Sequence, residues 1–259
     1  MKDYSVLFVT DNNFLPFAFR SIDTFFKTHE KCQVNIVCID CDEKRLKKLL
    51  EKLNESLKTN NHVLKVYEEK SKKGITSKDW AATRRAVYTK QIMIENPEKK
   101  GVFYFDVDYV FYKNSADLMF TDAKNYDFML RSSVRIKKDL ASLFQIENSV
   151  PNVSDSSFIE SRVWINSPRG KLGINSGLIW IRNNDVNKSL LDDWEKRMEK
   201  QNYVWFSDQN NLRDIIEENL IKGLINWRPV DFKHYESFYH EKGPKKMSKL
   251  NELNKILMS

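Results

Sequence analysis

The most informative segment of this chain is Phe103-Tyr104-Phe105-Asp106-Val107-Asp108-Tyr109-Val110. It starts with a short apolar run typical of a buried strand, and two carboxylates follow where that strand ends. In an extended chain, residues i and i+2 project to the same side, so Asp106 and Asp108 can reach one cation. Oxygen ligands favour Mg²⁺ or Mn²⁺, which commonly bind through one or two carboxylates plus substrate phosphates. A solvated turn is an equally simple explanation, because Asp is common at strand ends.

Short apolar runs alternate with amphipathic segments on both sides of this motif. β-branched and aromatic runs predict strands at residues 4–9, 33–39, 62–67, 102–105, 109–112, 126–131 and 174–182. Apolar residues at helical spacing predict helices after Pro16, after Asp42, over residues 77–95, around residues 190–198 and after Ser207. This alternation predicts an α/β fold with a central, mainly parallel mixed sheet flanked by helices. Ligands of such sheets bind beyond the carboxyl ends of the strands.

The composition is that of a globular protein. The 259 residues include 43 Lys or Arg and 36 Asp or Glu, a formal charge of +7, with 7 Gly, 6 Pro and 3 Cys. These values exclude a disordered tail and collagen-like sequence, and the chain is long enough to form a core without disulfides. Cys38 and Cys41 have no second cysteine pair, so burial at a strand end explains them better than zinc.

The basic excess is mostly Lys, whereas nucleic-acid readers tend to use the Arg guanidinium, so we expect no nucleic-acid partner. No apolar run approaches the roughly 18 residues of a membrane span. We therefore expect a cytoplasmic protein, with peripheral membrane contact as an alternative.

Four further segments carry candidate site residues, each with a simpler explanation beside it. On the helix at 77–95, Lys90 is the only charged residue within an apolar arc, which suggests that it and the nearby Arg84 and Arg85 face an anion; it can also snorkel to the rim. Gly177 inside a strand suggests close approach of a ligand or another backbone, or a bulge. The remaining two are Asp208-Gln209, which can be a plain helix cap, and His240-Glu-Lys-Gly243-Pro-Lys-Lys246, which can be a plain basic tail.

Together, and in this order, these segments resemble the GT-A-fold glycosyltransferases, most closely family 8. The matching motifs run from the turn after the first strand, through Asp106-Val107-Asp108 and Asn175-Ser176-Gly177, to Asp208-Gln209 and His240…Lys246. Two features depart from the family pattern: Met247-Ser248 follows Lys246 where the family often has Pro-Trp, and residues 132–173 match nothing. The departures leave the choice of Lys246 over Lys245 and the acceptor site open.

The resemblance implies a metal-dependent, retaining transfer of a hexose from a nucleotide diphosphate sugar, with a UDP-sugar expected, to a hydroxyl of a glycan, glycolipid or glycoprotein. It implies Mn²⁺ or Mg²⁺ held by Asp106, Asp108 and His240, and catalytic roles for Gln209, Asp208, Asp106 and Asp108. The donor-binding residues that it implies are Thr10, Asp11, Asn13, Arg85, Lys90, Asp106, Val107, Asn175, Ser176, Gly177, Gly243 and Lys246. The register of the basic residue on the helix at 77–95 is left open between Lys90 and the Arg84-Arg85 pair.

The implied organisation is one GT-A catalytic domain over residues 1–246, followed by an amphipathic basic tail at 247–259. The nucleotide-binding half is expected at 1–112, and the half for donor sugar and acceptor at 113–246. The tail can pack on the domain or contact an anionic membrane.

Two other functions compete with this one. A haloacid dehalogenase-type phosphatase would use Asp106 and Asp108 in an Asp-x-Asp-x-Val motif, but it leaves the N-terminal turn and the His240 segment unexplained. A non-enzymatic module that binds acidic ligands is the third class.

Overall fold

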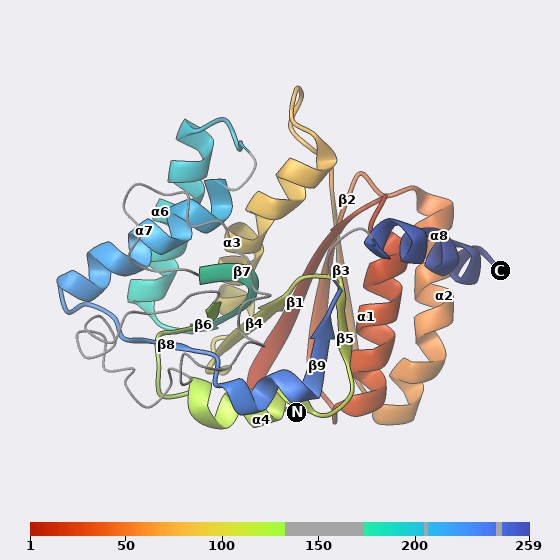
Figure 1. Ribbon diagram of the computed structural model, residues 1–259, viewed down its shortest axis with the longest axis horizontal. Coiled ribbons are helices and arrows are strands. Elements are labelled where there is room, and N and C mark those ends of the chain that lie inside the picture. The colour runs from red at the N-terminus through yellow and green to blue at the C-terminus, as the bar shows by residue number, and fades with distance from the viewer. Residues whose placement is uncertain (133–173, 205–206, 242–244) are drawn as a thin grey trace.

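The computed structural model describes residues 1–132, 174–204, 207–241 and 245–259, and these form a layered α/β structure (Figure 1). The strands are β1 (Tyr4–Asp11), β2 (Gln33–Ile39), β3 (Val63–Glu69), β4 (Gly101–Phe105), β5 (Tyr109–Phe111), β6 (Phe128–Ser132), β7 (Ile174–Arg182), β8 (Trp227–Pro229) and β9 (Phe238–His240). The helices are α1 (Leu15–Thr28), α2 (Glu43–Asn60), α3 (Ser77–Glu95), α4 (Ser115–Ala123), α6 (Asp185–Lys200), α7 (Ser207–Ile221) and α8 (Lys245–Met258), with a 3-10 helix at Phe232–Ser237.

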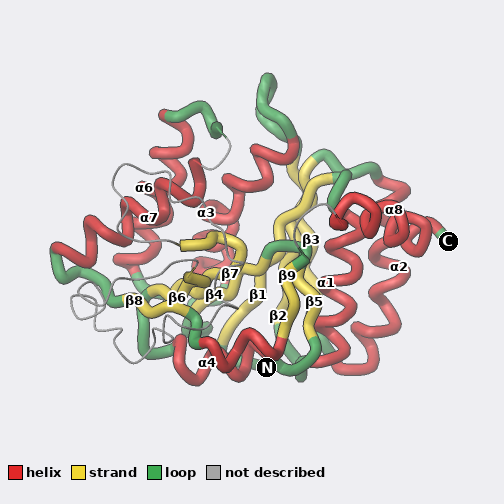
Figure 2. Tube along the Cα trace, in the orientation of Figure 1, coloured by secondary structure: helices red, strands yellow, loops and turns green. Residues whose placement is uncertain are grey.

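A seven-stranded sheet has the order β3-β2-β1-β4-β7-β6-β8. β1, β2, β3 and β4 run parallel, and β7 is inserted antiparallel between β4 and β6. The sheet is therefore mixed and mostly parallel, as predicted. The strands from both expected halves of the chain share it, and it forms the centre of the molecule in Figure 2.

Helices cover both faces of the sheet. One apolar cluster joins β1, β2 and β4 to α1, α2 and α8, and the other joins the opposite face to α3, α6 and α7. β1 is buried along its whole length because it lies between these layers, which explains its mainly apolar sequence.

The C-terminal residues pack on the domain, one of the two alternatives considered for them. α8 lies against α1 and α2, and its Leu253 and Leu257 are buried in the same cluster as Leu46 and Leu49 of α2. Within the described residues, none of the helices combines the length and the apolar character that crossing a bilayer requires.

The local signals for helix starts are correct at α2 and off by one residue at α3. The Asp42 side chain accepts a hydrogen bond from the Arg45 backbone N–H, as expected of a cap. At α3 the capping side chain is that of Thr76, which accepts from the Asp79 N–H, while Ser77 is the first helical residue and bonds Asp40 instead.

Candidate active site

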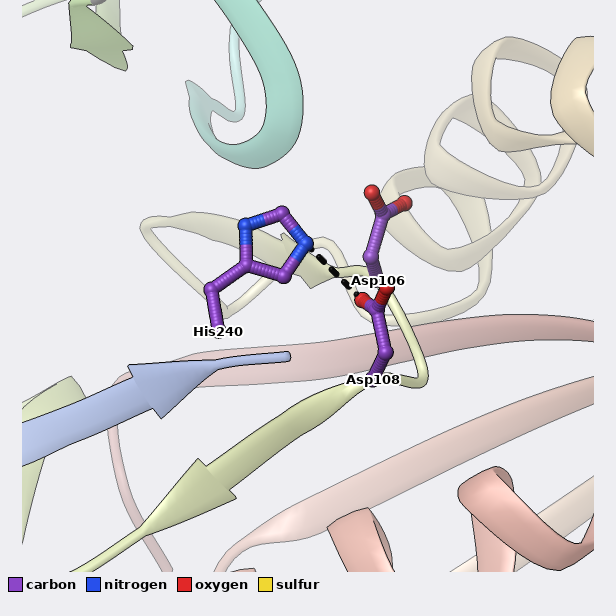
Figure 3. A group of neighbouring side chains, drawn as sticks. All are labelled: Asp106, Asp108 and His240. Carbon is purple, nitrogen blue, oxygen red and sulfur yellow. Dashed lines mark ion pairs between the residues drawn. The ribbon is translucent and has the colours of Figure 1, made fainter. Parts of the chain in front are cut away.

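Asp106, Asp108 and His240 converge at the carboxyl end of β4. Asp106 follows β4, Asp108 precedes β5, and His240 ends β9. β5 and β9 form an antiparallel ribbon in which Tyr109 is opposite His240, so the ribbon brings residues more than 130 positions apart into one site. The three side chains offer ligand atoms that all lie within 4.8 Å of one another (Figure 3). Two carboxylates and an imidazole are a donor set that Mn²⁺ or Mg²⁺ accepts, since both take oxygen ligands and imidazole suits the transition metals.

The surroundings of Asp108 fit a bound cation. His240 Nε2 lies 3.0 Å from Asp108 Oδ1, and Lys246 Nζ lies 2.5 Å from Oδ2. Oδ1 is buried and makes no aligned hydrogen bond within the described part of the chain. Burial raises the pKa of Asp108, but the nearby His240 and Lys246 outweigh it and hold the pKa below its usual value. Asp108 is therefore an ionised, buried carboxylate whose Oδ1 lies beside the His240 imidazole, and an anionic oxygen in this position can bind a cation.

Arg85 links the Asp106 carboxylate to the next strand and helix. One guanidinium nitrogen donates to the Ser176 carbonyl at 2.7 Å and lies 3.3 Å from Asp208 Oδ2; the other lies 3.7 Å from Asp106 Oδ1. The Tyr104 hydroxyl donates to Asp106 Oδ1 at 2.6 Å. The network fixes Asp106 and Asp208 relative to each other around one buried cation.

Gly177 leaves room for Asp106. A Cβ built at Gly177 would lie 2.5 Å from Asp106 Oδ2 and 2.8 Å from Asn175 Oδ1, so the approach of a neighbouring group explains this glycine. The approaching group is a side chain of the site itself. Asn175 Oδ1 also accepts from the Gly177 N–H at 2.9 Å, which holds the Asn175 side chain next to Gly177 on β7.

Asp208 and Gln209 at the start of α7 face the same strand. The Ser176 hydroxyl donates to Asp208 Oδ2 at 3.0 Å, and the Ser176 N–H donates to Gln209 Oε1 at 3.3 Å. Asp208 is also placed by the indole of Trp194, which donates to its carbonyl at 2.8 Å. Both side chains are thus tied to β7 beside Asp106.

The turn after β1 closes the other side of the site. Asp11 is buried, and its Oδ1 accepts the backbone N–H groups of Asn13 and Phe14, which fixes the turn. Burial raises the pKa of Asp11, and the positive charge of Lys78 opposes this shift. A pocket joins this turn to the motif carboxylates; it is lined by Val9, Thr10, Asp11, Phe14, Lys78, Ala81, Ala82, Arg85, Tyr104, Asp106, Val107, Asp108 and Lys246.

The prediction for Lys90 is not supported by the geometry. Its Nζ is paired with Asp192 of α6 at 2.5 Å, with both side chains partly exposed, so it faces a neighbouring helix instead of the pocket. Arg84 stacks on Trp80, 3.8 Å from the ring centroid, and lies near Glu69 and Glu195. Arg85 is the basic residue of α3 that reaches the site. Gly243, the remaining donor-binding candidate, lies outside the described residues.

Three residues of the site escaped the sequence analysis: Tyr104, Lys78 and Arg131. Tyr104 could have been found, because it precedes Asp106 by two positions on one strand and so projects to the same side. Lys78 lies seven residues, about two turns, before Arg85 on α3, and helical spacing alone does not separate it from solvated lysines. Arg131 lies near the end of β6, 109 positions before its hydrogen-bond partner His240, and no local pattern connects the two.

A mixed sheet of this order, with a carboxylate pair at the end of its central strand, defines a GT-A glycosyltransferase fold. The chain belongs to the nucleotide-diphospho-sugar transferase family, which it matches over residues 32–256. It is accordingly a glycosyltransferase that uses a nucleotide sugar, and membership of this family rejects the phosphatase alternative. No curated protein matches the chain by sequence.

Several solved glycosyltransferases share the fold at low sequence identity. The galactosyltransferase LgtC, crystallised with donor and acceptor sugar analogues, superposes with a TM-score of 0.55 at 11% identity, over 98% of this chain and 96% of LgtC. The bifunctional glycosyltransferase WbbM gives 0.53 at 11% identity, and GlyE of Streptococcus pneumoniae TIGR4 gives 0.52 at 13%. The match covers 82% of this chain and 37% of WbbM, and 90% of this chain and 47% of GlyE, so the chain spans less than half of either protein. These likenesses establish the fold.

Proposed function

We propose that this glycosyltransferase is a metal-dependent, retaining enzyme that moves a hexose from a nucleotide diphosphate sugar, a UDP-sugar by preference, to an acceptor hydroxyl. One observation carries the proposal: Asp106, Asp108 and His240 offer three ligand atoms within 4.8 Å of one another, next to Lys246 and Arg85. The site thus combines a hard-cation donor set with two fixed positive charges, which is what a departing diphosphate needs.

Asp106, Asp108 and His240 would hold Mn²⁺ or Mg²⁺, which when bound supplies positive charge to the diphosphate oxygens. The protein's own cations act on the same leaving group. Lys246 lies over the ring of Phe14, 4.8 Å from its centroid, and so stands between the motif carboxylates and the turn after β1. That placement puts the ammonium where a nucleotide bound in the pocket would carry its phosphates.

The turn after β1 is proposed to bind the nucleoside. Asp11 keeps one carboxylate oxygen free of the backbone hydrogen bonds to Asn13 and Phe14, and the pocket reaches it. A buried carboxylate can accept hydrogen bonds from a base imide or ribose hydroxyls. Thr10 and Asn13 shape the same turn, and Thr10 lines the pocket.

Asp208 and Gln209 are proposed to act at the donor sugar. Asp208 is held by Ser176 and Arg85, so its carboxylate has a fixed direction in which to receive sugar hydroxyls. The Gln209 amide oxygen is a weak nucleophile, and Ser176 N–H already occupies part of it. We therefore favour attack of the acceptor on the face that the diphosphate leaves, with a phosphate oxygen taking the acceptor proton. Detection of a glycosyl-enzyme adduct by mass spectrometry would contradict this route.

The acceptor is proposed to be a saccharide or glycoconjugate. Contact with a lipid-linked acceptor at a membrane is a further part of the proposal, for which α8 offers Lys249 and Lys255 outside its buried leucines. Liposome binding of the Lys249→Gln, Lys255→Gln double variant at two salt concentrations tests it, and unchanged binding rejects it. These substitutions, at a half-buried and an exposed lysine, leave Leu253 and Leu257 in place and so preserve the buried packing of α8.

The decisive experiment incubates the protein with a panel of nucleotide sugars and Mn²⁺ or Mg²⁺. We expect slow release of free sugar and nucleoside diphosphate, loss of this activity with EDTA, and its recovery on adding metal. Asp106→Asn and Asp108→Asn should abolish it, while Asp192→Asn, a matched carboxylate change beside Lys90, should not. Full activity of Asp106→Asn, or of the EDTA-treated protein, would overturn metal dependence. The anomeric configuration of the glycoside product, read by NMR, tests retention.

A further inference from the structure

Arg131 holds the nitrogen of His240 that faces away from the motif carboxylates. Its guanidinium donates to His240 Nδ1 at 2.6 Å and to the Tyr109 hydroxyl at 3.2 Å. The pairing of β6 with β7 shifts register between Leu130 and Arg131, and such a bulge redirects the side chain that follows it. The irregularity turns Arg131 toward the ribbon that carries His240.

The rest of the surroundings fixes the two side chains in this arrangement. The His240 ring stacks on Tyr109, with centroids 4.4 Å apart and an interplanar angle of 12°. The Arg131 guanidinium lies over the ring of Tyr235 at 5.2 Å. The imidazole therefore has little freedom to rotate away from Arg131.

The hydrogen bond decides which nitrogen of His240 carries the proton. A guanidinium has donors and no acceptor, so Nδ1 must accept and must be unprotonated. The ring proton of neutral His240 is then on Nε2, the atom that lies 3.0 Å from Asp108 Oδ1. A protonated Nε2 cannot bind a metal, because the lone pair that would bind it is occupied.

A metal-ligating histidine normally donates its other N–H to a carboxylate or a carbonyl. Arg131 provides the opposite partner, a donor with a fixed positive charge. We propose that Arg131 is a positioning residue that holds His240 in its Nε2-protonated form and so opposes metal binding, and that the guanidinium must leave Nδ1 before His240 can complete the site. The inference rests on the proposed metal site, and it adds a residue of the chain itself that regulates how readily that site binds its metal.

Comparing Arg131 with three substitutions at the same position separates the effect of the hydrogen bond from the effect of the charge. Lys keeps a donor-only cation, Met removes both donor and charge, and Gln is neutral but offers an oxygen that accepts from Nδ1–H. We measure Mn²⁺ affinity by electron paramagnetic resonance for wild type, Arg131→Lys, Arg131→Met and Arg131→Gln. Arg228→Met is the matched control, since Arg228 stacks on Tyr126 at 5.8 Å and lies on β8.

We expect affinity for Mn²⁺ to rise from wild type and Arg131→Lys, through Arg131→Met, to Arg131→Gln, with Gln roughly tenfold tighter than wild type. Equal affinity of the Met and Gln variants would overturn the role of the hydrogen bond. Weaker binding by either variant than by wild type would overturn the proposal as a whole. Circular dichroism of each variant confirms that it is folded.

The protonation of His240 is read directly by long-range ¹⁵N–¹H correlation NMR on the metal-free protein. The chain has 4 histidines, so His240→Asn assigns the signal. We expect the Nε2-protonated pattern in wild type and a shift toward Nδ1 protonation in Arg131→Gln. An Nδ1-protonated pattern in wild type refutes the inference even where Mn²⁺ binds. Failure of all these proteins to bind Mn²⁺, with the Nε2 pattern intact, would refute the metal site and the opposition to loading but not the hold of Arg131 on His240.

Discussion

Replacing Gly177 by Ala tests whether the site depends on the close approach of Asp106. The added Cβ would lie 2.5 Å from Asp106 Oδ2, where ordinary contact begins at 3.4 Å, so the carboxylate must move by about 0.9 Å. Asp106 cannot move freely, because Tyr104 donates to it at 2.6 Å and Arg85 lies 3.7 Å away. A misplacement of about 1 Å at a reacting group typically costs about a hundredfold in rate.

We therefore expect Gly177→Ala to lower kcat for donor cleavage by about a hundredfold, to raise the Mn²⁺ concentration needed for half-maximal rate, and to cost about 1–3 kcal/mol of unfolding free energy. Gly74→Ala is the matched control. Gly74 has φ +87° and nothing within 4 Å of a built Cβ, so Ala there adds about 1–2 kcal/mol of backbone strain away from the site. Turnover within about twofold of wild type in folded Gly177→Ala would refute the reasoning, since it would show that the Asp106 carboxylate can move without loss of activity.

Three further predictions address single residues. Arg85→Lys should lower kcat/KM for donor cleavage by about a hundredfold, because one ammonium cannot replace a guanidinium that reaches Asp208 and a backbone carbonyl together; near-normal kinetics would contradict this. Lys90→Met should leave those kinetics unchanged and cost less than about 1 kcal/mol in urea unfolding, because the pair with Asp192 is partly exposed; a large loss of activity would return Lys90 to the site. Burial lowers the pKa of His29 to about 3, so between pH 6.5 and 3 the unfolded chain binds a proton that the folded chain excludes. The free energy of unfolding should therefore decrease as the pH is lowered through this range, by up to about 1.4 kcal/mol per pH unit. Urea unfolding at several pH values checks this, and a slope unchanged in His29→Gln would show that another group is responsible.

Strands and helices were predictable where a buried face repeats along one segment. β2 and β7 have the predicted bounds because Gln33–Ile39 and Ile174–Arg182 are mainly apolar and β-branched segments with polar residues at their ends. The order of the strands was not predictable in the same way. Nothing local in Ile174–Arg182 says that it runs antiparallel beside β4, a pairing that depends on contacts about 75 positions apart.

The site residues likewise divide into those that have a local sequence signal and those that depend on distant parts of the chain. Asp106 and Asp108 were predictable from their spacing, and His240 from a motif. The choice between Lys90 and the Arg84-Arg85 pair was not, because the helical arc places only Lys90 inside the apolar face and gives no register for the two arginines beside it. On α3, Arg84 and Arg85 are both buried, since Trp80 covers one and carboxylates from other elements neutralise the other. A buried charge is stable only where an opposite charge lies beside it. For Arg85 that opposite charge is Asp208, more than 120 positions away in the sequence.

The balance of charge in the site supports the proposed divalent cation. Asp106, Asp108 and Asp208 are three carboxylates, and Arg85 and Lys246 are already committed to them at 2.5–3.7 Å. The diphosphate of a donor adds further negative charge beside these groups, and like charges at this range repel strongly in a buried site. Lys246 and Arg85 cannot offset the diphosphate without leaving carboxylates unpaired. Among the three carboxylates, Asp108 has a buried oxygen, Oδ1, that makes no aligned hydrogen bond within the described residues, so the position beside it is where added positive charge gains most. The same electrostatics apply to Arg131. Its guanidinium is hydrogen-bonded to His240 and so places a positive charge close to the proposed cation, which opposes binding of that cation.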